Sequence, residues 1–314
     1  MSFSNDVRNE LTRVMPEKNC CRKAELSALL ASSARWTEGE NGGMYLSVQA
    51  ENAATARKIY KLLKESYGLH AAVSSDVKKY FGKSHVYEVS VHIKPEERWI
   101  QRELLPFHRV PGKAAGAVSL LSKSCCKRAY LRGIFLSRGF VNRPEGDYHL
   151  EITFNDPSLA VEVQKLLARF DLHAHSFERK NNSVVYIKES DKIADFLRVV
   201  EASNALLDFE NVRIIKSMRN NVNRQVNCET ANLGKTIDAS LRQTDLIENL
   251  IARGGLESLP FNLRELALLR IDYPDSSLQE LGEMLKVPLS KSGVAYRMRK
   301  LERIAEEWMD RADI

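Results

Sequence analysis

Stretches in which apolar and polar residues alternate recur along the N-terminal part of the chain. They include Met44–Val48 and Tyr148–Phe154, followed later by Val86–Ile93 and Val184–Ile187. Such alternation predicts strands with one buried face. Longer amphipathic stretches lie between them, so each part reads as helix, strand, helix, strand. Hairpin partners are predicted near Val73–Val77 and His175–Arg179.

This order of elements occurs twice because the chain repeats itself. Cys20–Leu30 (CCRKAELSALL) matches Cys125–Phe135 (CCKRAYLRGIF), and Lys61–Ala71 (KLLKESYGLHA) matches Lys165–Ala174 (KLLARFDLHA). The blocks keep their order and nearly their spacing. The sequence therefore predicts an α+β body over residues 1–218, in which duplicated αββ units at about 20–104 and 125–205 each carry an antiparallel sheet. A pseudo-two-fold axis is expected between them.

The first helix of each unit carries small residues, as close packing of two helices requires. They are Ala28, Ala31, Ala34, Gly133, Ser137 and Gly139. This pattern resembles the LAGLIDADG homing endonucleases, whose two motif helices meet at a dimer-like axis. The matching segments are Leu26–Ala34 (LSALLASSA) and Leu131–Gly139 (LRGIFLSRG). In that family the next-to-last motif position is an acid that holds the divalent metal for phosphodiester cleavage, whereas here Ser33 and Arg138 occupy it.

These two substitutions bear directly on the chemistry. A serine and a guanidinium cannot replace carboxylates around hard cations, so no catalytic residue, no metal ion and no nuclease activity are expected. Arg138 either pairs with a DNA phosphate or forms a salt bridge at the end of a buried helix. The alternative function is a metal-dependent DNA endonuclease of the LAGLIDADG type that uses acids outside the motif. The nearby carboxylates are Glu38, Glu40, Glu145 and Asp147.

Two segments are predicted as linkers. Leu105–Gly112 (LPFHRVPG), bounded by two prolines and containing His108, separates the repeats. Residues 219–245 are rich in Asn and Gln, with little apolar bulk, and mark the boundary to a C-terminal domain at 246–314. This second segment is either an ordinary polar linker or a basic arm that follows the DNA backbone. Its basic residues are Arg219, Arg224, Lys235 and Arg242.

The C-terminal domain shows the signals of short capped helices. Asn262 with Glu265, and Ser276 with Gln279, have the spacing of capping boxes. Gly282 lies inside the second of these helices, where the missing side chain lets a neighbouring helix come close. A short turn is predicted at Lys286–Leu289, after which Ser290 opens the last helix. The second helix has its apolar face at Leu278, Leu281 and Leu285.

The last helix has an apolar stripe and a basic face. At 100° per residue, Val294, Met298, Leu301 and Ala305 share one side. Ser292, Tyr296, Arg299 and Arg303 lie on the other side. Between Ser290 and Arg303 five basic residues accompany one acid, Glu302. The basic residues are Lys291, Arg297, Arg299, Lys300 and Arg303.

This arrangement predicts an all-α helix-turn-helix over Ser276–Met309 that binds double-stranded DNA. A solvated bundle face or a membrane-surface helix would also be basic and amphipathic, but the apolar stripe is needed for packing inside the domain. We expect Ser292, Tyr296 and Arg299 to face base edges. Lys291, Lys300 and Arg303 are expected to hold phosphates. Ser290 and Arg297 complete the predicted set.

Composition agrees with a folded protein that binds an anionic partner. The 314 residues are 44% hydrophobic and 28% charged, with a formal net charge of +6 and a pI near 9.0. No uncharged apolar run has the length of a membrane span, so a cytoplasmic, nucleoid-associated protein is expected. The cysteines lack the CxxC spacing of zinc sites and are interpreted as buried thiols in a reducing compartment. They are Cys20, Cys21, Cys125, Cys126 and Cys228.

Three segments in this order carry a more specific resemblance. Ser2–Leu11 (SFSNDVRNEL), Asn227–Ser240 (NCETANLGKTIDAS) and Ser277–Leu301 are similar to the WhiA family, and the likeness spans essentially the whole chain. That family joins a degenerate LAGLIDADG body to a C-terminal helix-turn-helix. The resemblance implies a transcriptional regulator linked to sporulation, or to cell division and chromosome segregation, without nuclease activity or cofactor. A co-regulator protein or RNA polymerase is a further possible partner, and a purely structural chromosome-organising protein is another reading.

Overall fold

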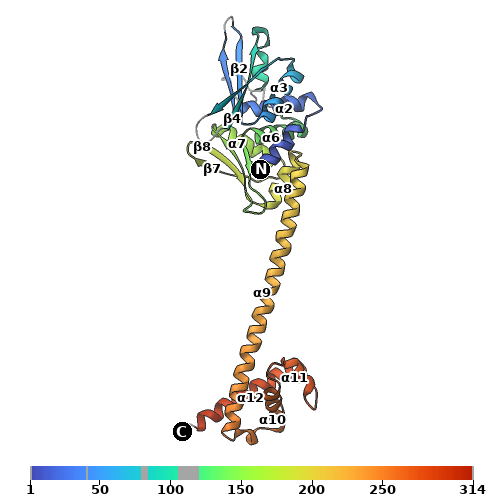
Figure 1. Cartoon of the computed structure of the whole chain (residues 1–314), viewed down its shortest axis with the longest axis vertical. Coiled ribbons are helices and arrows are strands. Elements are labelled where there is room, and N and C mark those ends of the chain that lie inside the picture. The colour runs from blue at the N-terminus through green and yellow to red at the C-terminus, as the bar shows by residue number, and fades with distance from the viewer. Residues whose placement is uncertain (1, 40–41, 79–83, 105–119, 313–314) are drawn as a thin grey trace. The chain divides into compact units, whose positions relative to one another are not determined.

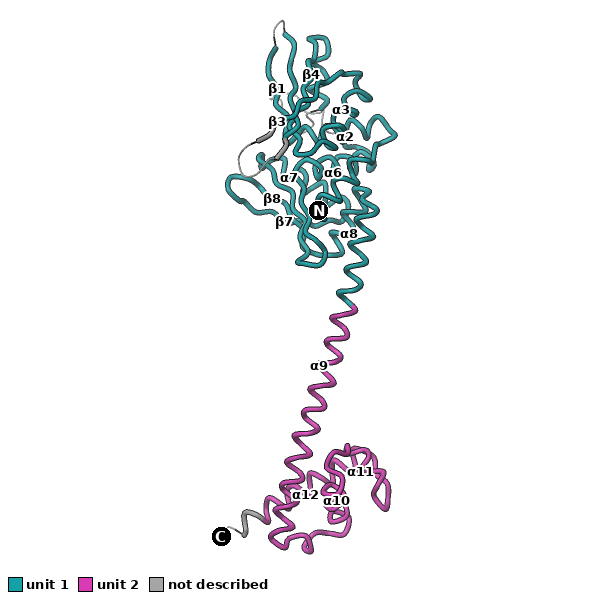
Figure 2. Tube along the Cα trace, in the orientation of Figure 1, with its two compact units in different colours: residues 1–217 teal, residues 218–314 magenta. Residues whose placement is uncertain are grey.

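The computed structural model describes residues 2–39, 42–78, 84–104 and 120–312 of the chain. The chain divides into two compact units, residues 1–217 and residues 218–314, which are coloured separately in Figure 2. The division lies next to the boundary expected from composition. The predicted linker Leu105–Gly112, with His108, lies outside the described residues, and so does Glu40.

Unit 1 contains the two repeats. After α1 (Phe3–Arg13), the first comprises α2 (Asn19–Ala31), β1 (Ala34–Glu38), β2 (Met44–Ala50), α3 (Ala53–Tyr67), β3 (Ala72–Lys78), β4 (Ser84–Ile93), a 3-10 turn at Pro95–Glu97 and α4 (Trp99–Leu104). The second comprises α6 (Ser124–Arg138), β5 (Gly139–Val141), β6 (Leu150–Phe154), α7 (Pro157–Ala168), β7 (His175–Arg179), β8 (Asn182–Ile187) and α8 (Ser190–Val199).

Both repeats form a four-stranded antiparallel sheet with the same topology. The strand orders are β1-β2-β4-β3 and β5-β6-β8-β7, which confirms the predicted duplication. Leu46 pairs with Val91 in the first sheet, and Ile152 pairs with Val185 in the second; all four side chains are buried. Each repeat is nevertheless longer than the predicted αββ unit. The strands β1 and β5, which follow the first helix almost directly, were not predicted from the sequence.

The helices α2 and α6 lie side by side where the two repeats meet (Figure 1). A Cβ atom on Gly133 would lie 2.5 Å from the carbonyl oxygen of Glu25 and 2.7 Å from the Cβ of Ala28. A side chain at this position would therefore force the helices apart. The prediction that small residues line this contact is correct for Gly133 and Ala28. The segment Leu26–Ala34 is not helical to its end, because α2 stops at Ala31.

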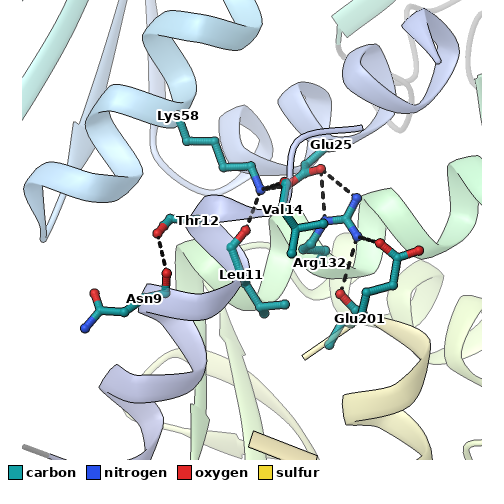
Figure 3. Close-up of polar contacts among 9 residues, drawn as sticks. Asn9, Leu11, Thr12, Val14, Glu25, Lys58, Arg132 and Glu201 are labelled. Carbon is teal, nitrogen blue, oxygen red and sulfur yellow. Dashed lines mark hydrogen bonds and ion pairs between the residues drawn. The ribbon is translucent and has the colours of Figure 1, made fainter. Parts of the chain in front are cut away.

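A buried ionic network joins these helices to their neighbours (Figure 3). The carboxylate of Glu25, which is fully buried, pairs with Lys58 of α3 and, at 3.0 Å, with Arg132 of α6. Arg132 also pairs with Glu201 at 2.5 Å. Burial lowers the pKa of Lys58, although Glu25 opposes this shift. Burial also acts against the charged form of Arg132, but Glu25 and Glu201 outweigh it and raise its pKa.

The lysine of this network also ties down the chain that precedes the repeats. Its Nζ donates hydrogen bonds of 2.7 Å to the carbonyl oxygens of Leu11 and Val14, at the end of α1. The helices α1, α2, α3 and α6 and the turn after α8 thus meet at one buried ionic network. Nothing in the local sequence pattern had indicated it.

Unit 2 is all-helical and has its own hydrophobic core. Helix α9 (Ser203–Ala252) crosses the division between the units, and its C-terminal turns contribute Ile247 and Leu250 to this core. The other elements are a 3-10 turn at Gly255–Ser258, α10 (Phe261–Asp272), α11 (Leu278–Met284) and α12 (Lys291–Ala312). None of the described helices is long and apolar enough to cross a membrane.

The segment 219–245, expected as a linker, is helical throughout and belongs to α9. Between Ser203 and Ala252 the sequence has no proline and only one glycine, Gly234. Asn and Gln are weaker helix formers than Ala, but they do not break a helix. Polar composition alone therefore hid the helix.

Candidate nucleic-acid interface

The candidate interface begins with the caps of the two short helices. Ser277 caps α11: its Oγ accepts a 3.3 Å hydrogen bond from the backbone N–H of Glu280, whose carboxylate accepts one of 2.7 Å from the N–H of Ser277. Hydrogen bonds that its carboxylate accepts from the backbone N–H and the hydroxyl of Ser277 lower the pKa of Glu280. The cap predicted at Ser276 with Gln279 is therefore wrong by one residue.

The predicted cap of α10 is also wrong. This helix begins at Phe261 after Pro260 and has no side-chain cap, so Asn262 lies inside it. Pro260 is the N-cap residue, and its carbonyl oxygen accepts hydrogen bonds of 2.9 Å and 3.0 Å from the N–H groups of Leu263 and Arg264, so the first turn closes before Asn262 could cap it. Glu265 serves a different purpose. Its carboxylate accepts a 2.8 Å hydrogen bond from the backbone N–H of Lys286 and so fixes the beginning of the turn after α11.

The turn between α11 and α12 folds closely over Gly282. The N–H of Leu289 donates a 3.0 Å hydrogen bond to the carbonyl oxygen of Gly282. A Cβ on Gly282 would lie 2.3 Å from the carbonyl oxygen of Leu289 and 3.0 Å from a methyl group of Val294. The glycine thus admits the turn as well as the neighbouring helix. Because Gly282 has no side chain, the turn and Val294 can pack closely against α11. This contact determines the position of α12 relative to α11.

Helix α12 has the two faces that the sequence predicts. Val294, Met298, Leu301 and Ala305 are at most 1% exposed. On the opposite side Tyr296 is 67% exposed. The hydroxyl of Ser290 accepts a 3.4 Å hydrogen bond from the N–H of Gly293 at the start of the helix. The other predicted contact residues that are exposed are Ser290, Lys291, Ser292, Arg299, Lys300 and Arg303.

Arg297 differs from the rest of the predicted set because it is only half-exposed and lies next to the buried stripe. Among the other cations, Arg303 forms a 3.8 Å ion pair with Glu307, and Arg299 donates to the carbonyl oxygen of Ala295. Within the described part of the chain, Lys291 and Lys300 have no carboxylate partner. Their charge is therefore available to an anionic ligand.

Two buried polar contacts brace α12 and α10 against α9. The amide of Gln243 donates a 2.9 Å hydrogen bond to Glu302 of α12. Arg270 of α10, which is 2% exposed, donates a 3.4 Å hydrogen bond to the hydroxyl of Ser240 in α9. It also donates to the carbonyl oxygens of Ser276 at 2.7 Å and Pro274 at 3.2 Å, in the segment between α10 and α11. These contacts hold α12, the candidate recognition helix, and α10 against the C-terminal part of α9.

The four cations predicted in the segment 219–245 all lie on exposed positions of α9. At about 100° per residue, Arg224, Lys235 and Arg242 fall within about 20° of one another around the helix. Arg219 lies roughly 140° or more away from them. The helix therefore aligns three of the four residues on one face and separates the fourth.

Ser33 and Arg138 lie together beside an open pocket of about 770 Å³ in unit 1, at the C-terminal ends of α2 and α6. The Oγ of Ser33 donates a 2.9 Å hydrogen bond to the carbonyl oxygen of Leu29, and Arg138 donates one of 3.2 Å to the carbonyl oxygen of Ser32. Arg138, which belongs to the second repeat, thus bonds to a backbone carbonyl group of the first repeat. The predicted salt bridge does not occur among the described residues.

The carboxylates proposed as alternative metal ligands do not gather here. Glu38 is 85% exposed and pairs with Arg98 at 3.4 Å, while Glu145 and Asp147 lie exposed in the loop between β5 and β6. Among the described residues no group of three or more carboxylates lies close enough together to hold a metal ion. Of the described residues that line the pocket, Glu51 is the one carboxylate, and it lies 3.9 Å from Arg8.

Three family models match consecutive parts of the chain. The WhiA N-terminal LAGLIDADG-like domain matches residues 19–104, the WhiA LAGLIDADG-like domain matches residues 127–219, and the WhiA C-terminal HTH domain matches residues 222–305. A protein from Syntrophomonas wolfei named "Probable cell division protein WhiA" is 61% identical over 310 residues, which cover 98% of each chain. The chain belongs to the WhiA family. The predicted resemblance is thereby confirmed.

Other WhiA proteins are similar over nearly their full length. The identity is 47% over 307 residues for the protein from Heliobacterium modesticaldum, covering 98% of this chain and 96% of that one. A crystal structure of full-length WhiA from Thermatoga maritima matches 98% of this chain and 99% of that chain, with a TM-score of 0.60 and 24% identity. This likeness supports the fold of two LAGLIDADG-like units followed by a helix-turn-helix region.

Proposed function

We propose that this WhiA-family chain is a sequence-specific transcriptional regulator that binds double-stranded DNA through α12. The observation that carries the proposal is the exposed basic face of this helix, braced on its other side by a buried apolar stripe. Ser292, Tyr296 and Arg299 read base edges in the major groove. Lys291, Lys300 and Arg303 hold phosphates on either side.

The biological setting of the proposal comes from the relatives. The proteins from Syntrophomonas wolfei and Heliobacterium modesticaldum both carry the name of a probable cell division protein. Those names support only a role in cell division. We extend the proposal to a cytoplasmic, nucleoid-associated regulator that acts on genes of cell division and chromosome segregation or of sporulation. The aligned cations of α9 support additional contacts to the DNA backbone.

The function is tested by selecting bound duplexes from a random pool with the full-length protein. The expected result is a defined sequence motif for the wild type, which is lost in a variant that combines Lys291→Ala, Arg299→Ala and Lys300→Ala. Lys61→Ala, at an exposed position of α3, is the control and should select the same motif as the wild type. Tight binding without any motif would favour a chromosome-organising protein and sink the proposal.

Unit 1 is proposed to have no nuclease activity, because Ser33 and Arg138 stand where the metal-holding acids would be and bond to backbone carbonyls. It serves instead as a second DNA surface or as a platform for a co-regulator or RNA polymerase. Supercoiled plasmid carrying the selected motif, incubated with the protein and Mg²⁺ or Mn²⁺, should stay intact. Nicking at a specific site would instead support the endonuclease alternative.

A further inference from the structure

Each of the two central helices begins with a pair of adjacent cysteines. Cys20 and Cys21 lie in the first turn of α2, and Cys125 and Cys126 lie in the first turn of α6. The helices α2 and α6 pack side by side between the two repeats and run in the same direction. Their N-terminal cysteine pairs therefore lie next to each other. The four Sγ atoms all lie within 4.8 Å of one another. Cys21 and Cys126 are buried, and the other two are half-buried.

Four sulfur atoms in such a cluster suit a soft metal ion. Zinc is held by four thiolates at about 2.3 Å in a tetrahedron, whose edges are then about 3.8 Å long. The sulfur atoms therefore need to approach one another by at most about 1 Å, which small χ1 rotations can supply. Hard cations such as Mg²⁺ and Ca²⁺ prefer oxygen ligands and are excluded by this donor set.

We propose that Cys20, Cys21, Cys125 and Cys126 bind one zinc ion that ties the two repeats together. Each repeat supplies two of the four ligands, so the ion bridges α2 and α6. The site is distinct from the motif positions Ser33 and Arg138, which lie at the other ends of these helices. Cys126 and Arg138, both in α6, are 12 residues apart, or about 18 Å along the helix.

The surroundings of the cluster suit a metal site. A pocket of about 560 Å³ reaches Cys21 and Cys125 from the surface and offers a path of entry. The charged residues that line this pocket are Lys18, Arg128, Arg132, Glu17 and Glu201. Their net charge is positive and offsets part of the negative charge of a tetrathiolate. Zinc binds the thiolate form of cysteine, so binding must displace thiol protons and weaken as the pH falls.

This site lacks the CxxC spacing by which zinc sites are usually recognised in a sequence. Neither CC pair resembles a zinc motif when it is taken alone. The signal was present in another form: both pairs occupy the same position in a duplicated helix, and the two copies pack against each other. A residue duplicated near a pseudo-two-fold axis lies close to its own copy.

The test uses full-length protein purified under reducing, oxygen-free conditions, with zinc measured by elemental analysis and Co²⁺ as a spectroscopic substitute. We expect about one metal ion per chain and, with Co²⁺, the thiolate charge-transfer and intense visible bands of a tetrahedral sulfur site. A double variant, Cys20→Ala with Cys125→Ala, removes two half-buried ligands and should lose both signals. Cys228→Ala, at an exposed position of α9, is the control and should keep them.

The proposal is overturned if the wild type binds no more zinc or Co²⁺ than the double variant, or if its Co²⁺ spectrum is that of an oxygen-ligated octahedral ion. Thiol titration tests for a redox role. A disulfide between the repeats in oxygen-free protein, with no metal bound, would also contradict the zinc proposal. Should the double variant fail to fold by circular dichroism, the wild-type Co²⁺ spectrum decides by itself. Removing the ion with a strong chelator should lower the Tm of the wild type.

Discussion

Glu25 is the residue on which the polar centre of unit 1 depends, because it faces two cations that are themselves buried. Replacing it with Gln keeps its volume but leaves Lys58 and Arg132 without the carboxylate they share. Breaking a buried ion pair in this way costs about 3–5 kcal/mol. We expect Glu25→Gln to lower the urea midpoint of unit 1 accordingly.

The control for this variant is Glu65→Gln, which removes a surface carboxylate that lies 3.1 Å from Arg22. Exposed pairs of this kind contribute about 0.2–1 kcal/mol. A loss in Glu25→Gln as small as that in Glu65→Gln would mean that the buried network does not hold the helices together.

Arg299 and Lys300 are adjacent in α12 but are predicted to act on different parts of DNA. Arg299→Ala should weaken binding by about 1–3 kcal/mol and relax preference at one base pair, because it removes a contact to a base edge. Lys300→Ala should weaken binding to all duplexes alike and reduce the salt dependence by about one unit, because it removes a phosphate contact. Binding measured over a series of salt concentrations, with the selected motif and single-base variants of it, separates the two. Equal effects from both substitutions would contradict the assignment.

At the scale of the elements, the capping box of α11 offers a direct comparison of sequence and structure. Ser277→Ala should reduce the free energy of unfolding of unit 2 by about 0.5–2 kcal/mol, because the N–H of Glu280 loses its acceptor. Ser276→Ala is the matched control and should change it little. Chemical denaturation of both variants measures this difference. A larger loss of stability in Ser276→Ala than in Ser277→Ala would instead support the cap that the sequence predicts at Ser276.

This cap also has a pH dependence of known sign. The pKa of Glu280 is lower in the folded chain than its ordinary value of 4.5, because it accepts hydrogen bonds from Ser277. Its contribution is therefore present above that ordinary value and is lost as the pH falls through the lower folded-state pKa. Ser277→Ala keeps the backbone N–H that donates to Glu280 and removes only the hydroxyl. The part of the stability difference that comes from the hydroxyl should therefore shrink in acid.

Local patterns were sufficient to predict elements whose burial is decided by their own sequence. The predicted apolar stripe that includes Val294 and Met298 is found in the structure, because a helix of known period buries one face. The strand β5 was missed because three residues, Gly139–Val141, are too few to show alternation. Helix α9 was missed because polarity was taken for irregular structure.

Contacts between distant segments could not be predicted in the same way. The network around Glu25 joins residues more than 100 positions apart, as Arg132 shows. The cysteine cluster and the backbone contact of Arg138 likewise depend on how the repeats pack. For the candidate DNA interface the sequence was more informative, because most of its residues lie on the single helix α12.

At the scale of the whole molecule, the described residues form two separate hydrophobic cores, one in each unit. Domains with separate cores need not unfold together. Calorimetry of the full chain should therefore show two transitions, of which Glu25→Gln shifts one and Ser277→Ala shifts the other. A single transition that both variants move equally would show that the units unfold cooperatively.

Every residue of α9 from Met218 to Asp238 has an exposed side chain. This stretch is held by its own backbone hydrogen bonds, and helices without packing are only marginally stable in water. Transient fraying would present Arg219, Arg224 and Lys235 to trypsin well before either core opens. Brief digestion is therefore expected to yield two intact fragments. The exposed part of α9 is a practical place to divide the protein for studying each half.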